Sequence, residues 1–274
     1  MSTISTTRVA EGTMVMAESV DAVDMAAIIR DVTAEEVAFY EENGWVKLDR
    51  LVTPEYAREL RRVGEAHEDG IHPPGSWNSL ATDPGVEPFR ALMFSERMGR
   101  NAEQLINRRR LTDVQVPLRY RADHFVRRPP GGAHGTPYHQ DSVEHGSDRA
   151  GELQFWLALD EVTPEMGAMR FLSGVHRAGP LGAVLRDERD LLQQYPKLLD
   201  LYEMSPPFHY QPGDATVHHG YMVHGAPPNT SDRARWCYIF SYTPADTRWP
   251  HGVTKNWGSE KVPLDGARNP IVYP

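Results

Sequence analysis

A histidine and an aspartate two residues apart, His139 and Asp141, are the residues of this sequence best suited to metal chemistry. They follow a turn rich in proline and glycine (residues 128–135), which is typical of a strand entered from a loop. Side chains two positions apart on a strand project from the same face, so we expect the imidazole and the carboxylate to converge. A neutral nitrogen and an anionic oxygen are two of the three ligands that hold non-haem Fe(II).

The same spacing occurs at His67 and Asp69, where it does not indicate a metal site. The residues before this pair follow a helical pattern, and positions i and i+2 of a helix point about 200° apart. We interpret His67 and Asp69 as solvated surface residues.

The third ligand should be a histidine from a distant strand. His218, His219 and His224 all lie in a stretch, residues 215–224, that is predicted to form one strand. His218 and His224 share a face of that strand, and His219 lies on the other face. We prefer His224 to His218 because a glycine and a proline-rich loop follow it, which places it at a strand end and at the mouth of a barrel. We interpret His219 as a hydrogen-bonded core residue.

Arg235 lies eleven residues beyond His224, early in the next predicted strand. A guanidinium that points inward beside a metal needs an anionic partner, because an unpaired buried charge is costly. Its fork of N–H groups fits a carboxylate through two parallel hydrogen bonds. The partner that fits is 2-oxoglutarate, with its keto-acid end on Fe(II) and its far carboxylate on Arg235. The neighbouring Arg233 is expected to be exposed.

The segments that must position these residues predict a mainly β protein with flanking helices and a double-stranded β-helix (jelly roll, cupin-like) core. Helices are expected first: Thr33 to Glu36 form a capping box, Gly44 ends that helix, and further helices follow over 54–68 and 87–107. Strands are expected at 45–48, at 113–127 (strand, turn and strand), 152–159, 168–172, 215–224 and 236–242.

The expected domain organisation is a mobile N-terminal arm (1–30) followed by a single domain (31–274). We divide that domain into a helical N-terminal part (33–107), a jelly-roll core (about 113–243) and a C-terminal extension (244–274).

Composition excludes several classes of protein. The chain has 274 residues, a net charge of −9 and no basic stripe, so nucleic-acid binding is disfavoured. Its one cysteine, Cys237, excludes an internal disulfide and fits a reducing compartment. No apolar run approaches the roughly 18 residues of a membrane helix, and the N-terminus lacks a signal-peptide pattern. We expect a cytoplasmic protein without a membrane or nucleic-acid partner; the oligomeric state is not predicted.

The order of these motifs resembles that of the phytanoyl-CoA dioxygenase family of Fe(II)/2-oxoglutarate-dependent oxygenases. Besides the residues above, the resemblance includes the blocks 156–160 and 167–176 and the pair Gly213-Asp214, and it covers about residues 33–243. It implies that His139, Asp141 and His224 bind iron and that Arg235 binds the cosubstrate. It also implies that Trp156 lines the 2-oxoglutarate site.

Two positions depart from the family pattern. Ala226 stands where many members carry a serine that helps to hold the cosubstrate. Without that hydroxyl, Arg235 must contribute a larger share of cosubstrate binding. Arg128 stands where many carry lysine, and we interpret it as structural. Asp141 is retained, whereas family-like halogenases replace this carboxylate with a small residue, so halogenation is not expected.

The expected activity is attack on a C–H bond of a small organic substrate with O₂ as oxidant. Hydroxylation is the default outcome, and ring closure, desaturation or epimerisation are related outcomes. The motifs resemble those of bacterial members that tailor secondary metabolites, including polyketides and antibiotics. Two alternatives remain open: a cupin-like metalloenzyme that does not use 2-oxoglutarate, and a non-catalytic small-molecule binding protein.

Overall fold

The computed structural model describes residues 24–68, 80–82, 85–106, 116–132, 134–184, 190–248 and 269–274. Most of the expected N-terminal arm (residues 1–23) and Asp69 lie outside these ranges. None of the described helices is both long and apolar enough to cross a membrane.

Thr33 begins helix α2 (Ala34–Asn43) as the sequence predicts. Its hydroxyl accepts a hydrogen bond from the backbone N–H of Glu36 (3.2 Å), and the Glu36 carboxylate accepts one from the backbone N–H of Thr33 (2.8 Å). Gly44, with φ of +75°, ends the helix, and strand β1 (Trp45–Leu48) follows at once. A side chain at Gly44 would collide with the imidazole of His176. Local signals therefore fix where this segment changes direction.

The remaining N-terminal helices are α1 (Met25–Ile28), α3 (Pro54–Glu68), α4 (Glu87–Met93) and α5 (Glu96–Ile106). The sequence predicts helical structure over 87–107, and the structure has helix there but divides it into α4 and α5. The chain breaks at Ser95, whose hydroxyl accepts a hydrogen bond from the backbone N–H of Met98 (3.2 Å) and so starts a new helix. Four apolar residues of these two helices are fully buried: Phe89, Leu92, Met93 and Met98.

The larger sheet has six antiparallel strands in the order β1–β6–β4–β8–β2–β9. Its further members are β2 (Leu118–Arg128), β4 (Leu153–Ala158), β6 (Ala215–His219), β8 (Arg235–Pro244) and β9 (Ile271–Tyr273). The smaller sheet, in the order β3–β7–β5, comprises β3 (Thr136–His139), β7 (His224–Ala226) and β5 (Arg170–Phe171). The short helices are α6 (Asp141–His145), α7 (Leu191–Gln194) and α8 (Leu198–Leu201), with 3-10 turns η1 (Leu80–Thr82), η3 (Pro164–Met166) and η4 (Val175–Ala178).

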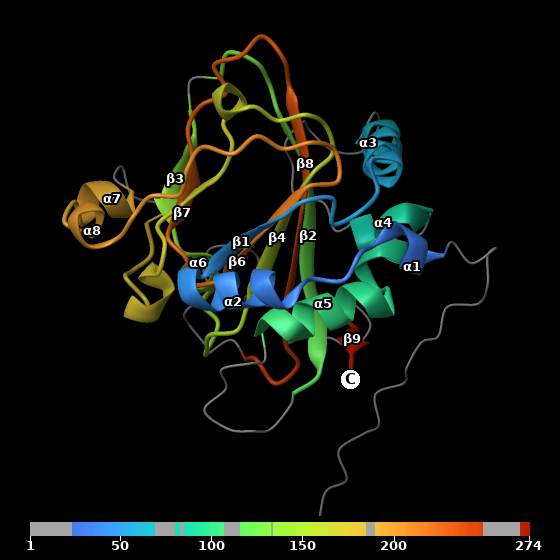
Figure 1. Ribbon diagram of the computed structural model, residues 1–274, viewed down its shortest axis with the longest axis horizontal. Helices are drawn as coiled ribbons and strands as arrows, with labels where there is room; N and C mark the ends of the chain where they lie inside the picture. The colour runs from blue at the N-terminus through green and yellow to red at the C-terminus, as the bar shows by residue number, and fades with distance from the viewer. Residues whose placement is uncertain are drawn as a thin grey trace, which may run out of the picture.

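The larger sheet lies between two layers. Helices α1, α3 and α4 lie on one side of β2 and β8, and the smaller sheet lies on the other side (Figure 1). Alternate residues of β8 divide between the two cores, because side chains of a strand point to opposite faces. Tyr238 and Phe240 pack with the helices, whereas Cys237 and Ile239 pack toward the smaller sheet. This is the predicted fold class, a double-stranded β-helix with flanking helices.

The predicted turn within residues 113–127 is absent from the described part of that segment. Residues 118–128 form the single strand β2, paired with β8 over its length. A shift of register between Tyr120 and Ala122 marks a bulge in this strand. Residues 113–115 lie outside the described ranges.

Asp123, on β2, is a carboxyl group buried in the helix-facing core. It accepts hydrogen bonds from the hydroxyls of Tyr120 and Tyr238 and from the backbone N–H of Ala81. Burial raises the pKa of Asp123 from 3.8 to about 6, although these hydrogen bonds lower it. The contact to Ala81 ties turn η1 to the sheet.

We expect Asp123→Asn to change how stability depends on pH. The folded protein holds the proton of Asp123 more tightly than the unfolded chain does. The free energy of unfolding of the wild type should therefore fall as pH rises from about 4 through about 6. The loss between about pH 4 and about pH 7 should reach about 2 kcal/mol in the free energy of unfolding. Asparagine cannot ionise, so the variant should gain on the wild type by that amount over the interval. Urea denaturation of the variant and the wild type at both pH values measures this change. The same difference in free energy of unfolding at the two pH values would contradict a raised pKa at Asp123.

Candidate active site

Two paired strands of the smaller sheet bring His139 and His224 together. His139 is the last residue of β3, His224 is the first of β7, and they are direct partners in the antiparallel register. Their ring centroids lie 4.4 Å apart. Both side chains are buried, with 6% and 3% of their surface exposed. The smaller sheet therefore fixes the separation of the two imidazoles.

Backbone carbonyls hold both rings in the same orientation. The Nδ1 atom of His139 lies 2.7 Å from the carbonyl oxygen of Pro137, and Nδ1 of His224 lies 3.0 Å from that of Met222. A carbonyl only accepts, so we assign the proton of each neutral ring to Nδ1. The Nε2 lone pairs of both rings are then free to act as metal ligands. This is the arrangement in which a partner on the other nitrogen sets the tautomer of a ligating histidine.

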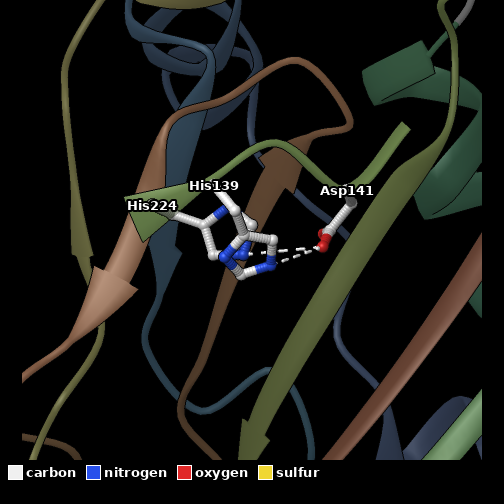
Figure 2. Close-up of side chains that lie close together, drawn as sticks. All are labelled: His139, Asp141 and His224. Atoms are coloured by element: carbon white, nitrogen blue, oxygen red, sulfur yellow. Dashed lines mark hydrogen bonds and ion pairs between the residues drawn. The ribbon is translucent and has the colours of Figure 1, made fainter. Parts of the chain in front are cut away.

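Asp141 completes the group, but not from the strand that the sequence predicts. It is the first residue of helix α6, and the extended residue Gln140 lies between this helix and β3. Its Oδ1 atom lies 3.2 Å from Nε2 of His139 and 3.7 Å from Nε2 of His224 (Figure 2). One atom from each of the three residues lies within 4.8 Å of the others. Two imidazole nitrogens and one carboxylate oxygen fit non-haem Fe(II).

The electrostatics of this group favour a charged carboxylate at Asp141 and a neutral imidazole at His224. Burial alone would raise the pKa of Asp141, but the neighbouring His224, His139 and His218 hold it well below its usual range. Burial, and then the neighbouring His218, lower the pKa of His224 well below its ordinary value. Asp141 is therefore ionised at neutral pH, as a ligand of a divalent cation must be.

His218 also reaches Asp141, although the predicted single strand over 215–224 does not exist. The chain turns after β6, where the backbone N–H of Met222 donates to the carbonyl of His219 (2.7 Å), and it enters the smaller sheet as β7. His224 thus begins a strand instead of ending one. Nε2 of His218 lies 2.9 Å from Oδ2 of Asp141. His219 accepts a hydrogen bond at Nδ1 from the backbone N–H of Tyr221 (2.9 Å), as expected of a structural histidine.

Arg235, the first residue of β8, is buried with 2% of its surface exposed. Its Nη1 donates to the carbonyl of Gly167 (2.7 Å), and its guanidinium lies 5.1 Å from the centre of the Trp156 ring. Its Nε is buried without a hydrogen-bond partner, and no carboxylate of the described chain forms an ion pair with it. Burial lowers the pKa of Arg235. A buried cation in this state fits an anionic ligand.

A second cation, Arg128, lies opposite Arg235 in the β2–β8 register. Its Nη2 donates to the hydroxyl of Thr136 (2.6 Å). Burial, and then the charge of Arg235, lower the pKa of Arg128 to about 10. Sequence reasoning did not connect these two residues, because their proximity depends on the pairing of β2 with β8. Arg233 behaves as predicted: it is exposed and pairs with Glu161.

The family model described as Phytanoyl-CoA dioxygenase (PhyH) matches residues 40–237. A relative from Oryza sativa subsp. japonica, Phytanoyl-CoA dioxygenase 1, is 26% identical over 84% of this chain and 73% of its own length. Among solved structures, the non-haem α-ketoglutarate-dependent carbocyclase SnoK from nogalamycin biosynthesis is 24% identical, with a TM-score of 0.68 over 87% of this chain and 96% of its own. The epimerase SnoN, solved with Fe³⁺, α-ketoglutarate and nogalamycin RO, is 22% identical, with a TM-score of 0.64 over 87% and 97%.

Proposed function

Because the chain belongs to the phytanoyl-CoA dioxygenase family of Fe(II)/2-oxoglutarate-dependent oxygenases, we propose that it oxidises a small organic substrate at an iron held by His139, Asp141 and His224. The observation that carries this proposal is the buried group of two imidazoles and one carboxylate. The buried cation of Arg235, which forms no ion pair within the described chain, supports it. We further propose that residues 31–274 act as one domain, because the N-terminal helices and the C-terminal strand β9 pack on the same sheet.

The protein's own residues orient and bind. His139 and His224 present Nε2 because the carbonyls of Pro137 and Met222 hold their Nδ1 atoms. Asp141 contributes the negative charge that retains a divalent ion. When bound, Fe(II) and 2-oxoglutarate supply the oxidising chemistry, in which the keto acid is converted to succinate and CO₂ as O₂ is consumed.

We assign the far carboxylate of 2-oxoglutarate to Arg235. The guanidinium can offer two parallel N–H groups, and Trp156 holds it from one face. Arg128 adds a second positive charge near the same position, and Ala226 offers no hydroxyl there. An anion with a full negative charge at its far end is the ligand that these two cations favour.

The substrate is proposed only by class. SnoK and SnoN act in nogalamycin biosynthesis, and they share the fold of this chain at low sequence identity. Together with the family resemblance, this supports a role in tailoring a secondary metabolite, with a polyketide as one candidate. Hydroxylation, ring closure, desaturation and epimerisation all begin with attack on a C–H bond, so the proposal covers these four outcomes.

Anaerobic loading with Fe(II) tests the proposal. Addition of 2-oxoglutarate should produce a metal-to-ligand charge-transfer absorption, and admission of O₂ with a panel of candidate substrates should release succinate. An unchanged absorption together with no succinate from any substrate would contradict the oxygenase proposal. Metal-dependent turnover that ignores 2-oxoglutarate would instead indicate a cupin-like enzyme.

A further inference from the structure

The two oxygens of Asp141 have different surroundings. Oδ1 faces the Nε2 atoms of His139 and His224, at 3.2 Å and 3.7 Å. Oδ2 lies 2.9 Å from Nε2 of His218 and 3.2 Å from Nε2 of Gln154. One oxygen is therefore directed at the proposed metal position, and the other is held by the protein.

The two residues that hold Oδ2 come from the larger sheet. Gln154 on β4 and His218 on β6 are direct partners in the antiparallel register, and both are buried. His139 and His224 belong to the smaller sheet. Asp141, at the start of α6, thus bridges the two sheets, and its position is fixed relative to both. A single helix residue without these contacts would be free to rotate away from the metal.

The hydrogen-bond chemistry fixes the state of His218. A carboxylate oxygen only accepts, so both Gln154 and His218 must donate to Oδ2, and Nε2 of His218 carries a proton. In the neutral ring Nδ1 is then an acceptor, and it is buried without a hydrogen-bond partner among the described residues. The ring otherwise contacts other rings, with the Phe171 centroid at 5.4 Å and the His224 centroid at 4.1 Å. An apolar ring would satisfy these surroundings equally well, so packing alone does not explain a histidine here.

We propose that His218, assisted by Gln154, is a positioning residue that holds Asp141 through Oδ2 and so directs Oδ1 at the metal. This inference rests on the metal site proposed above. His218 itself does not ligate the metal, because its Nε2 is committed to Asp141. The expected consequence of losing the donor is weaker metal binding, since substitution of a residue that holds a metal ligand typically lowers metal affinity by about 10- to 100-fold.

Three substitutions at His218 separate this role from packing. His218→Phe keeps an aromatic ring and removes the donor. In His218→Gln the amide nitrogen can occupy the position of Nε2, whereas in His218→Asn it can reach only the position of Nδ1. His218→Gln should therefore restore what His218→Phe and His218→Asn lose. His219→Asn, one residue away and without contact to Asp141, is the matched control because its amide oxygen can still accept from Tyr221.

Anaerobic calorimetric titration of each metal-free protein with Fe(II) measures the effect, and thermal unfolding of the same samples monitors the fold. We expect Kd to rise about 10- to 100-fold for His218→Phe and His218→Asn and to stay within about threefold of wild type for His218→Gln and His219→Asn. Equal Kd values for wild type and His218→Phe would overturn the inference while leaving the metal site intact. Failure of the wild type to bind Fe(II) would instead overturn the proposed function, and this inference with it.

Discussion

Asp141→Ala should reduce succinate formation to less than about one thousandth of the wild-type rate, a loss of more than about 4 kcal/mol in transition-state stabilisation. Asp141 is the only anion of the proposed donor set, and its Oδ1 lies within 3.7 Å of both ligating imidazole nitrogens. Without it, two neutral imidazoles face a divalent cation in a buried site. The lower rate of succinate formation should therefore result mainly from weaker Fe(II) binding.

Metal content after anaerobic loading and succinate release measure this prediction together. Near-ultraviolet circular dichroism should show that the fold survives, because α6 and both sheets keep their other contacts. Asp200→Ala, at an exposed position of α8, is the control and should bind Fe(II) as the wild type does. An Asp141→Ala protein that retains stoichiometric Fe(II) and succinate formation would refute the assignment of this carboxylate.

The elements that the sequence predicts correctly are those with a local cause. The capping box of Thr33 and Glu36, the left-handed Gly44 and the strand that follows need no distant residue. The same local rules could have located the break between α4 and α5, because Ser95 is a good N-cap residue. Roles for His139, Asp141, His224 and Arg235 could be proposed from the sequence, because few kinds of site need two histidines, a carboxylate and an arginine at such spacings.

The other differences between prediction and structure have long-range causes. The strand predicted over 215–224 breaks because Gly220 lies against α6: its carbonyl accepts from the backbone N–H of Ser142 (2.9 Å), and a Cβ at Gly220 would overlap the Ser142 hydroxyl. No local pattern contains that contact. The contact of His218 with Asp141 also has a long-range cause. The pairing of β4 with β6 places His218 beside Gln154, and both contact Asp141.

Arg235→Met should raise the KM for 2-oxoglutarate by about 100- to 1000-fold, equivalent to about 3–4 kcal/mol, which is the range for losing one partner of a buried charge pair. The buried guanidinium has no carboxylate partner in the described chain, so the ligand must supply one. Arg235→Lys should fall between wild type and Arg235→Met, because lysine keeps the charge but not the two parallel N–H groups. Arg233→Met, at the exposed neighbour, should leave KM unchanged.

Arg235→Met weakens cosubstrate binding but should not lower the stability of the ligand-free protein. An unpaired buried cation destabilises the fold, so Arg235→Met without ligand should unfold at a temperature no lower than the wild type does, despite losing the hydrogen bond to Gly167. With Fe(II) present, 2-oxoglutarate should raise the melting temperature of the wild type, because it binds only the folded state, and should leave that of Arg235→Met nearly unchanged. A variant that lost stability without ligand yet kept its 2-oxoglutarate response would show that Arg235 is structural. The cosubstrate carboxylate would then have to bind elsewhere, with Arg128 as the remaining cation beside the site.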